Sequence, residues 1–206
     1  MRIKRALTVS DIISYRGDTL DFTGKWLESF GRPELKGSWI AWANSTNGKT
    51  DFAIQLAKYF ATFKRVAYDS LEEGLSETIK NAIVRHNMKE VQRRFNLLDK
   101  EPISELKDRL RRRKSPDIIF IDSLQYTGLT YKEYCRLMDE FTHKLFVWIS
   151  HAEGRAPHGN VAKSIKYDSN VKIYIEGYKA FPESRYGGGE PFTIWPKGAA
   201  EYWDYK

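Results

Sequence analysis

Short runs of apolar residues alternate with longer mixed segments from residue 38 onward. Because the runs are continuously apolar, we expect strands buried on both faces, as in a parallel sheet. The five runs are SWIAWA at 38–43, RVAYDS at 65–70, DIIFIDS at 117–123, LFVWISH at 145–151 and VKIYIEG at 171–177. This alternation predicts an α/β fold with a mostly parallel, twisted sheet flanked by helices.

The segments between these runs carry apolar residues at helical spacing. They predict helices over residues 49–63, 75–95, 103–113 and 132–143. In the first segment, apolar side chains occupy much of the helix circumference, which predicts a central and buried helix.

Both ends of the chain depart from this pattern. Residues 1–36 contain a helical pattern at 8–15 followed by polar turns, and we expect an arm that packs on the core or on a neighbouring subunit. Residues 37–206 would form the core. The tail from 182 to 206 contains three consecutive glycines and the aromatic runs FTIW and EYWDY, which predict a C-terminal β-hairpin.

Composition narrows the classes of protein. Hydrophobic residues make up 41% of the chain, which is enough to build a buried core. The net charge of +7 favours acidic partners such as nucleic acid, with ordinary solubilising charge as the alternative. A single cysteine cannot form an internal disulfide, which favours a reducing cytoplasm. Because no run of about 18 apolar residues and no signal-peptide pattern occurs, we expect a soluble protein without membrane contact.

The segment ANSTNGKT at 43–50 follows an apolar strand and opens a predicted helix, the context of a phosphate-binding loop. Backbone N–H groups would hold the phosphates of ATP, while Lys49 reaches the terminal phosphates and Thr50 binds Mg²⁺. Ala43 replaces the usual first glycine, which a negative φ would accommodate. The residues expected to contact nucleotide are Asn44, Ser45, Thr46, Asn47, Gly48, Lys49, Thr50 and Asp51.

Acidic residues follow two of the predicted strands. Asp122 ends the strand at 117–122 and would bind Mg²⁺ beside Thr50. Glu72 and Glu73 follow the strand at 65–70, and Glu72 is the candidate catalytic carboxylate that orients or deprotonates the attacking water. The alternative is that this acidic pair only begins the next helix, where acids suit the helix dipole.

With these residues in order, the chain resembles the RecA superfamily, and within it the bacterial RadA repair ATPases and DnaB-type helicase cores. The resemblance covers about residues 37–187. It rests on the phosphate loop and on the motifs SLEE at 70–73, IDSLQ at 121–125, SHAEG at 150–154 and ESRYG at 183–187. It implies a RecA-like P-loop NTPase core that hydrolyses ATP, without the zinc module and protease-like domain of full RadA proteins. This small core suits a phage or mobile-element protein.

The resemblance also implies roles for two further residues. His151 resembles the polar residue that senses the γ-phosphate, and Arg185 resembles the finger that reaches a nucleotide on the adjacent subunit. A homo-oligomeric ring or filament is therefore implied. Glu183 stands where the family has a lysine, which removes one cation from that inter-subunit site.

The segment at 154–163 occupies the place of the DNA-contacting loop of RecA-like proteins. Its Arg155, His158 and Lys163 would contact backbone phosphates of single-stranded DNA, and the alternative is a mobile loop that orders only with ATP. The leading hypothesis is an ATPase that assembles on single-stranded DNA in recombination, repair or replication. The alternatives are a nucleotide-switched regulatory ATPase that binds a protein partner without DNA, and a small-molecule kinase. His86 and His143 are interpreted as surface residues without chemistry.

Overall fold

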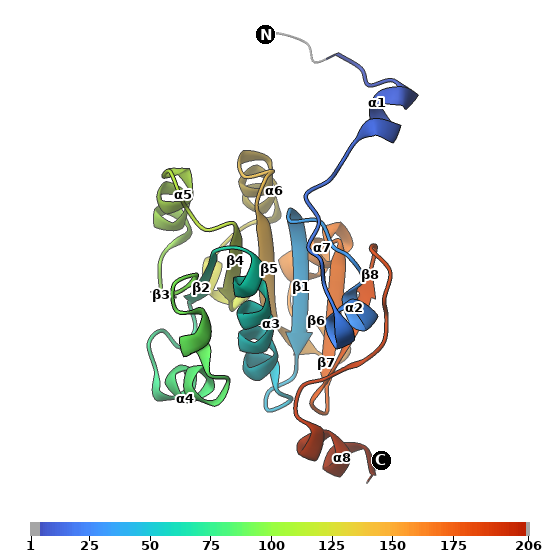
Figure 1. Ribbon diagram of the computed structural model, residues 1–206. Helices are drawn as coiled ribbons and strands as arrows, with labels where there is room; N and C mark the ends of the chain where they lie inside the picture. Colours follow the sequence, from blue (N-terminus) through green and yellow to red (C-terminus); the bar gives the residue numbers. More distant parts are fainter. Residues whose placement is uncertain (1–4, 205–206) are drawn as a thin grey trace.

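The computed structural model describes residues 5–204, in which nine strands form one sheet between two layers of helices (Figure 1). The sheet order is β3-β2-β4-β5-β1-β7-β8-β9, and β6 pairs with β5. The strands from β3 to β7 in this order are parallel, whereas β6, β8 and β9 pair antiparallel. The strands are β1 Gly37–Ala43, β2 Val66–Ser70, β3 Phe95–Asp99, β4 Ile118–Asp122, β5 Leu145–Glu153, β6 Ala156–Pro157, β7 Val171–Glu176, β8 Lys179–Ser184 and β9 Phe192–Thr193.

Helices cover both faces of this sheet. On one face α2 Gly24–Phe30, α3 Lys49–Phe63 and α4 Glu77–Arg85 pack over one buried cluster. On the other face α5 Ile103–Arg111, α6 Tyr131–Glu140 and α7 Asn160–Asp168 cover a second cluster. Short 3₁₀ turns span Met88–Val91 and Leu124–Thr127.

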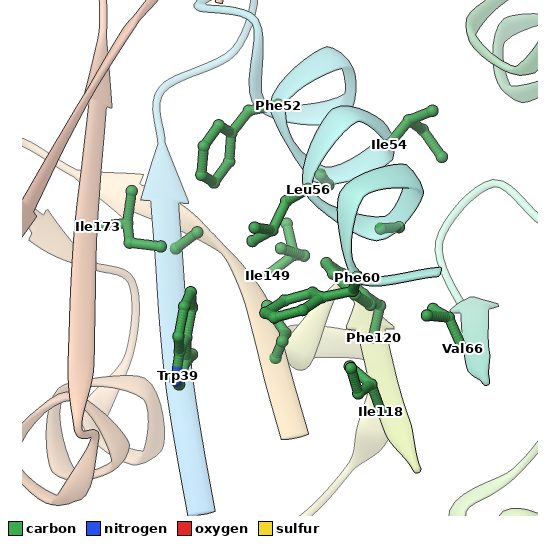
Figure 2. Close-up of a cluster of buried hydrophobic side chains, with 14 of the residues drawn as sticks. Trp39, Phe52, Ile54, Leu56, Phe60, Val66, Ile118, Phe120, Ile149 and Ile173 are labelled. Atoms are coloured by element: carbon green, nitrogen blue, oxygen red, sulfur yellow. The ribbon is translucent and has the colours of Figure 1, made fainter. Parts of the chain in front are cut away.

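The α3 helix is the centre of the first cluster. Figure 2 shows Phe52, Leu56 and Phe60 of this helix directed toward Trp39 and Ile149 of the sheet. The side chains of these five residues are fully buried. The expectation of a central and buried helix at 49–63 is therefore confirmed, and this packing fixes the position of the loop that precedes α3.

All five predicted strands are present, but the helix predicted over 75–95 is wrong. The α4 helix ends at Arg85, the chain turns at Asn87 with φ of 48°, and β3 begins at Phe95. An edge strand hydrogen-bonds to only one neighbour and buries little, and in β3 only Leu98 is buried. Its apolar pattern is therefore too weak to be distinguished, in the sequence, from the helical pattern that precedes it.

The N-terminal region has two parts. Its α1 helix, Val9–Ser14, is capped by Thr8, and none of its residues is buried. Residues 20–35 instead pack on the core, where Leu20, Phe22 and Phe30 join the first buried cluster beside α3. In Figure 1 α1 stands away from the sheet, beyond the end at which β1 begins.

The C-terminal antiparallel hairpin is present and is formed by β7 and β8. Of the two aromatic runs in the tail, FTIW contributes the short β9 strand, which pairs antiparallel with β8. The EYWD segment instead lies in the α8 helix, Pro196–Asp204. Pro196 occupies the first helical position, where its fixed φ and missing N–H are tolerated. Trp203 of α8 donates a hydrogen bond from Nε1 to the Gly177 carbonyl at 3.0 Å, which holds the helix against the β7–β8 turn.

The segment at 154–163 contains a short strand and the start of a helix. The β5 strand continues to Glu153 and pairs with β6, and α7 begins at Asn160. Among the helices of residues 5–204, none combines the length and the apolar character that crossing a membrane requires.

Candidate nucleotide-binding site

A cavity of about 780 Å³ opens where β1, β2, β4 and β5 end. Ligands of parallel α/β sheets bind at this carboxyl edge, because loops diverge there toward opposite faces. The predicted phosphate-loop residues line the cavity with the exception of Asn47, and Glu72, Asp122 and His151 line it as well.

The phosphate loop connects β1 to α3. Gly48 has φ of 89° and precedes the first helical residue, Lys49, so the N-terminus of α3 faces the cavity. Thr46 is also left-handed, with φ of 63°, whereas Ala43 has a negative φ and is buried. The missing first glycine is therefore accommodated without backbone strain.

Asn47 makes a structural contact instead of lining the cavity. Its Oδ1 accepts a hydrogen bond from the Gly177 N–H at 2.8 Å, and its Nδ2 donates to the Ser45 carbonyl at 3.0 Å. The Asn47 side chain therefore ties the phosphate loop to the β7–β8 turn.

Asp122 lies at the end of β4 with 7% of its surface exposed. The Tyr68 hydroxyl donates a hydrogen bond to its Oδ2. Burial raises the pKa of Asp122, while the Tyr68 hydrogen bond and the charge of Lys49 act in the opposite direction. Within residues 5–204, no group of three or more His, Cys, Asp and Glu side chains could hold a metal ion. A hydroxyl from Thr50 and one carboxylate nevertheless fit Mg²⁺, which usually takes few protein ligands together with substrate phosphates and water.

Glu72 is held beside Asp122 by contacts between two loops. The Glu72 N–H donates to the Asp122 carbonyl at 3.2 Å, and the Ser123 hydroxyl donates to Glu72 Oε2 at 2.5 Å. Glu73 turns elsewhere and accepts a hydrogen bond from Ser76 at 2.9 Å. The two adjacent acids are thus distinguished by their contacts.

His151 lies between the phosphate loop and Glu72. Its Nε2 is 3.3 Å from Glu72 Oε2, and its Nδ1 is 3.4 Å from Lys49 Nζ. Burial and the charge of Lys49 lower the pKa of His151 below its ordinary value near 6.5, so the imidazole is neutral at pH 7. Lys49 at the start of α3, Glu72 in the turn after β2 and His151 of β5 therefore form one contiguous group.

Sequence reasoning missed two parts of the cavity, the Arg85 and His86 side chains beside the predicted Asp51 and the wall of Tyr178 and Trp195. Asp51 Oδ1 accepts hydrogen bonds from Arg85 at 2.5 Å and from His86 at 2.7 Å, and the His86 bond is the main cause that lowers the pKa of Asp51. His86 is interpreted from the sequence as a surface residue, but its side chain is only 16% exposed and lines the cavity. Tyr178 and Trp195 form another wall.

Arg185 lies at the opposite end of the sheet from the phosphate loop. It follows β8, and its N–H donates to the Asn170 carbonyl, one residue before β7 begins. Since β7 runs parallel to β1, Arg185 is near the start of β1, and it does not reach the cavity of its own chain.

The three basic residues of the 154–163 segment lie outside the cavity and face acidic side chains. Arg155 is 3.6 Å from Glu176, while Lys163 and His158 are 3.3 Å and 3.9 Å from Glu153. Phosphate contacts by these residues would have to compete with the carboxylates.

Comparison with known proteins identifies the fold. No protein-family model matches the chain, and no curated protein matches it in sequence. Among solved structures, the chain is similar to the flagellar accessory protein FlaH from Methanocaldococcus jannaschii, with a TM-score of 0.62 and 15% sequence identity. The match covers 88% of this chain and 96% of the FlaH chain. Together with the sheet order and the loop between β1 and α3, this likeness shows that the chain has a RecA-like α/β fold.

Proposed function

We propose that the chain binds ATP with Mg²⁺ in this cavity and hydrolyses it. The observation that carries the proposal is the contact of His151 with both Lys49 and Glu72, at 3.4 Å and 3.3 Å, beside the phosphate loop. In the proposed site, a cation for the phosphates and a carboxylate for water would flank one neutral imidazole.

Binding would depend on the phosphate loop. Its backbone N–H groups and the N-terminus of α3 favour negative charge. Lys49 would leave His151 and turn to the terminal phosphates, since a charged ligand competes well with a neutral imidazole. Mg²⁺ held by Thr50 and Asp122 would neutralise charge that develops on the phosphates.

Hydrolysis would depend on Glu72. The carboxylate accepts a proton from the attacking water, the water oxygen bonds to the γ-phosphorus, and the bond to the β-phosphate oxygen breaks. Ser123 holds the carboxylate through its 2.5 Å hydrogen bond. His151, freed from Lys49 by the nucleotide, is placed to contact both the γ-phosphate and Glu72.

The test of this proposal compares two adjacent acids. Glu72→Gln should retain Mg²⁺–ATP binding, measured by calorimetry, and lose phosphate release, whereas Glu73→Gln should release phosphate at the wild-type rate. Glu73 is the matched control because it also lines the cavity but hydrogen-bonds to Ser76. Normal hydrolysis by Glu72→Gln would exclude this residue as the catalytic carboxylate.

As the output of this ATPase, we propose assembly of a homo-oligomer on single-stranded DNA. The net charge of +7 and the Arg155 side chain, 84% exposed near the carboxyl edge, support a nucleic-acid partner. The position of Arg185 supports an arrangement in which it serves the cavity of a neighbouring copy. A nucleotide switch that binds a protein partner is the second candidate, and it is favoured by the exposed apolar residues of α1.

ATP turnover measured with and without single-stranded DNA across a salt series separates these two candidates. A DNA-dependent ATPase should be stimulated, and the stimulation should fade as salt rises because phosphate contacts release counterions. Arg155→Ala should reduce the stimulation and leave the basal rate unchanged. Absence of both stimulation and binding would favour the protein-partner switch.

A further inference from the structure

One wall of the cavity has no role in the proposed hydrolysis. It is formed by Tyr178, Ile194 and Trp195. The Trp195 side chain is 46% exposed, and its ring meets that of Tyr178 edge to face, with centroids 5.0 Å apart. A large aromatic face is thus open within a cavity whose other walls are mainly polar.

This wall is attached directly to the phosphate loop. Asn47 of the loop accepts a hydrogen bond from the N–H of Gly177, the residue before Tyr178. A Cβ on Gly48 would lie 3.0 Å from the Tyr178 ring, so the ring lies against the backbone of the loop. Tyr178 itself has φ of 57°, a conformation that costs free energy for a non-glycine residue and persists when its surroundings fix it.

Trp195 is positioned by two other elements. Gln55 of α3 donates from Nε2 to the Ile194 carbonyl at 3.1 Å, and the Ile194 N–H donates to the Tyr178 carbonyl at 2.9 Å. On the α8 side, the Trp195 ring packs over Gly198, where a Cβ would lie 2.1 Å from a ring atom. The wall is therefore preformed and needs no ligand to assemble it.

We propose that Trp195, supported by Tyr178, stacks against the base of the bound nucleotide. The inference rests on the proposed function, because a triphosphate on the phosphate loop brings the rest of the nucleotide into the same cavity. The Gln55 amide N–H is already engaged by Ile194, and Asp51 is engaged by Arg85 and His86. The ring face, which every base possesses, is then the main feature recognised. The site accordingly takes nucleoside triphosphates and discriminates little between adenine and guanine.

The test compares ligands that differ in the base. Binding of Mg²⁺–ATP, Mg²⁺–GTP and Mg²⁺–tripolyphosphate is measured by calorimetry for the wild type and for Trp195→Ala. We expect the variant to bind both nucleotides about tenfold or more weakly, because loss of base stacking costs on this order. Its affinity for tripolyphosphate, which has no base, should remain within about twofold. Tyr167→Ala is the matched control, since Tyr167 is 79% exposed on α7 and outside the cavity.

A second variant keeps the test decisive if Trp195→Ala folds poorly. Trp195→Phe retains an aromatic face and should bind ATP within about threefold of the wild type. ATP, but not tripolyphosphate, should quench the tryptophan fluorescence of the wild type, and this quench should disappear in Trp195→Phe. Trp39 and Trp148 are fully buried, so they are poor sources of such a signal.

The outcomes separate failure of the wall from failure of the proposed function. If the wild type binds neither ATP nor tripolyphosphate, the nucleotide site itself is wrong. If the wild type binds both ligands and Trp195→Ala leaves its affinity for ATP unchanged, the base lies elsewhere in the cavity. A weaker affinity for ATP in Arg85→Ala would then place the base against α4. A quench that persists in Trp195→Phe, or a preference above about 100-fold for one purine, would also overturn the proposal.

Discussion

The two ends of the sheet differ in the contacts that their candidate functional side chains make within the chain. At the carboxyl end, Lys49, Glu72 and His151 contact one another within one chain. At the other end, the Arg185 side chain makes no hydrogen bond or ion pair with the rest of residues 5–204, and no residue of α1 is buried. In Figure 1 α1 lies beyond the end at which β1 begins, away from the phosphate loop.

This difference bears on the proposed assembly of copies. His151 lies 3.3 Å from Glu72 and 3.4 Å from Lys49, so these side chains are positioned before any ligand binds. The exposed Arg185 and the exposed apolar side chains of α1 are the groups that the proposed neighbouring copy would meet. Joining unlike ends of identical chains gives a heterologous interface, which closes into a ring or continues as a filament.

The largest expected effect is at the carboxyl end. Lys49→Ala should weaken ATP binding about 100-fold, since it removes charged hydrogen bonds to phosphate, and should reduce phosphate release to background. Lys58→Ala is the control on the same helix, because Lys58 is paired with Glu90 at 2.8 Å outside the cavity. Retained turnover in Lys49→Ala would place nucleotide chemistry elsewhere.

The next effect tests whether the two ends meet. Arg185→Ala should lower turnover about 10³-fold if its guanidinium stabilises the transition state on a neighbouring copy. Mixing Arg185→Ala with Lys49→Ala should restore part of the activity, because some interfaces then join an intact Lys49 to an intact Arg185. No rescue at any mixing ratio would contradict sharing between subunits.

A buried acid near the cavity predicts a pH-dependent stability. Burial raises the pKa of Asp69 to about 7, and its Oδ2 has no hydrogen-bond partner among residues 5–204. Because the folded state holds this proton more tightly than the unfolded state, the stabilisation is complete below about pH 4 and is lost as pH rises toward 7. Asp69→Asn should therefore be more stable than the wild type at pH 8, by about 2–4 kcal/mol, and similar to it at pH 4.

Urea unfolding at several pH values measures this difference. The exposed Asp139→Asn substitution is the control and should follow the wild type at every pH. A wild-type stability that does not decline between pH 5 and 8 relative to Asp69→Asn would contradict the inferred protonation.

The smallest expected effect is in α1. Ile13 is 72% exposed, so Ile13→Ser should change the free energy of unfolding by less than about 0.5 kcal/mol. Phe60→Ala, in the core, should cost about 3–5 kcal/mol. If α1 meets a neighbouring copy, Ile13→Ser should nevertheless shift the assembly toward the monomer in sedimentation. A large loss of stability without any change in association would show that α1 packs on its own core.

Local patterns predicted the sheet and the position of the loop between β1 and α3 for physical reasons. Strands buried on both faces must be continuously apolar, and a loop that binds phosphate must join a strand to a helix start. The edge strand β3 was not predicted, because only Leu98 of this strand is buried and its apolar pattern is weak. The helix that contains the EYWD segment was not predicted, because its aromatic residues are typical of strands. Pro196 is a residue that often begins a helix.

The remaining cavity residues depend on packing that no local pattern records. Asp51 meets Arg85 and His86, which are 34 and 35 positions away, only because α4 lies beside α3. Trp195 meets Tyr178 because the chain after β9 returns to the β7–β8 turn. The ion pairs of Arg155 and Lys163 likewise arise from the β5–β6 turn and the start of α7.

The most direct test is a structure of the chain with Mg²⁺ and a non-hydrolysable ATP analogue. The triphosphate should lie on the phosphate loop, with Lys49 moved from His151 to the phosphates and a water within hydrogen-bond reach of both Glu72 and the γ-phosphorus. A triphosphate bound elsewhere, or a Glu72 carboxylate that contacts no water near the γ-phosphate, would contradict the proposed ATPase site.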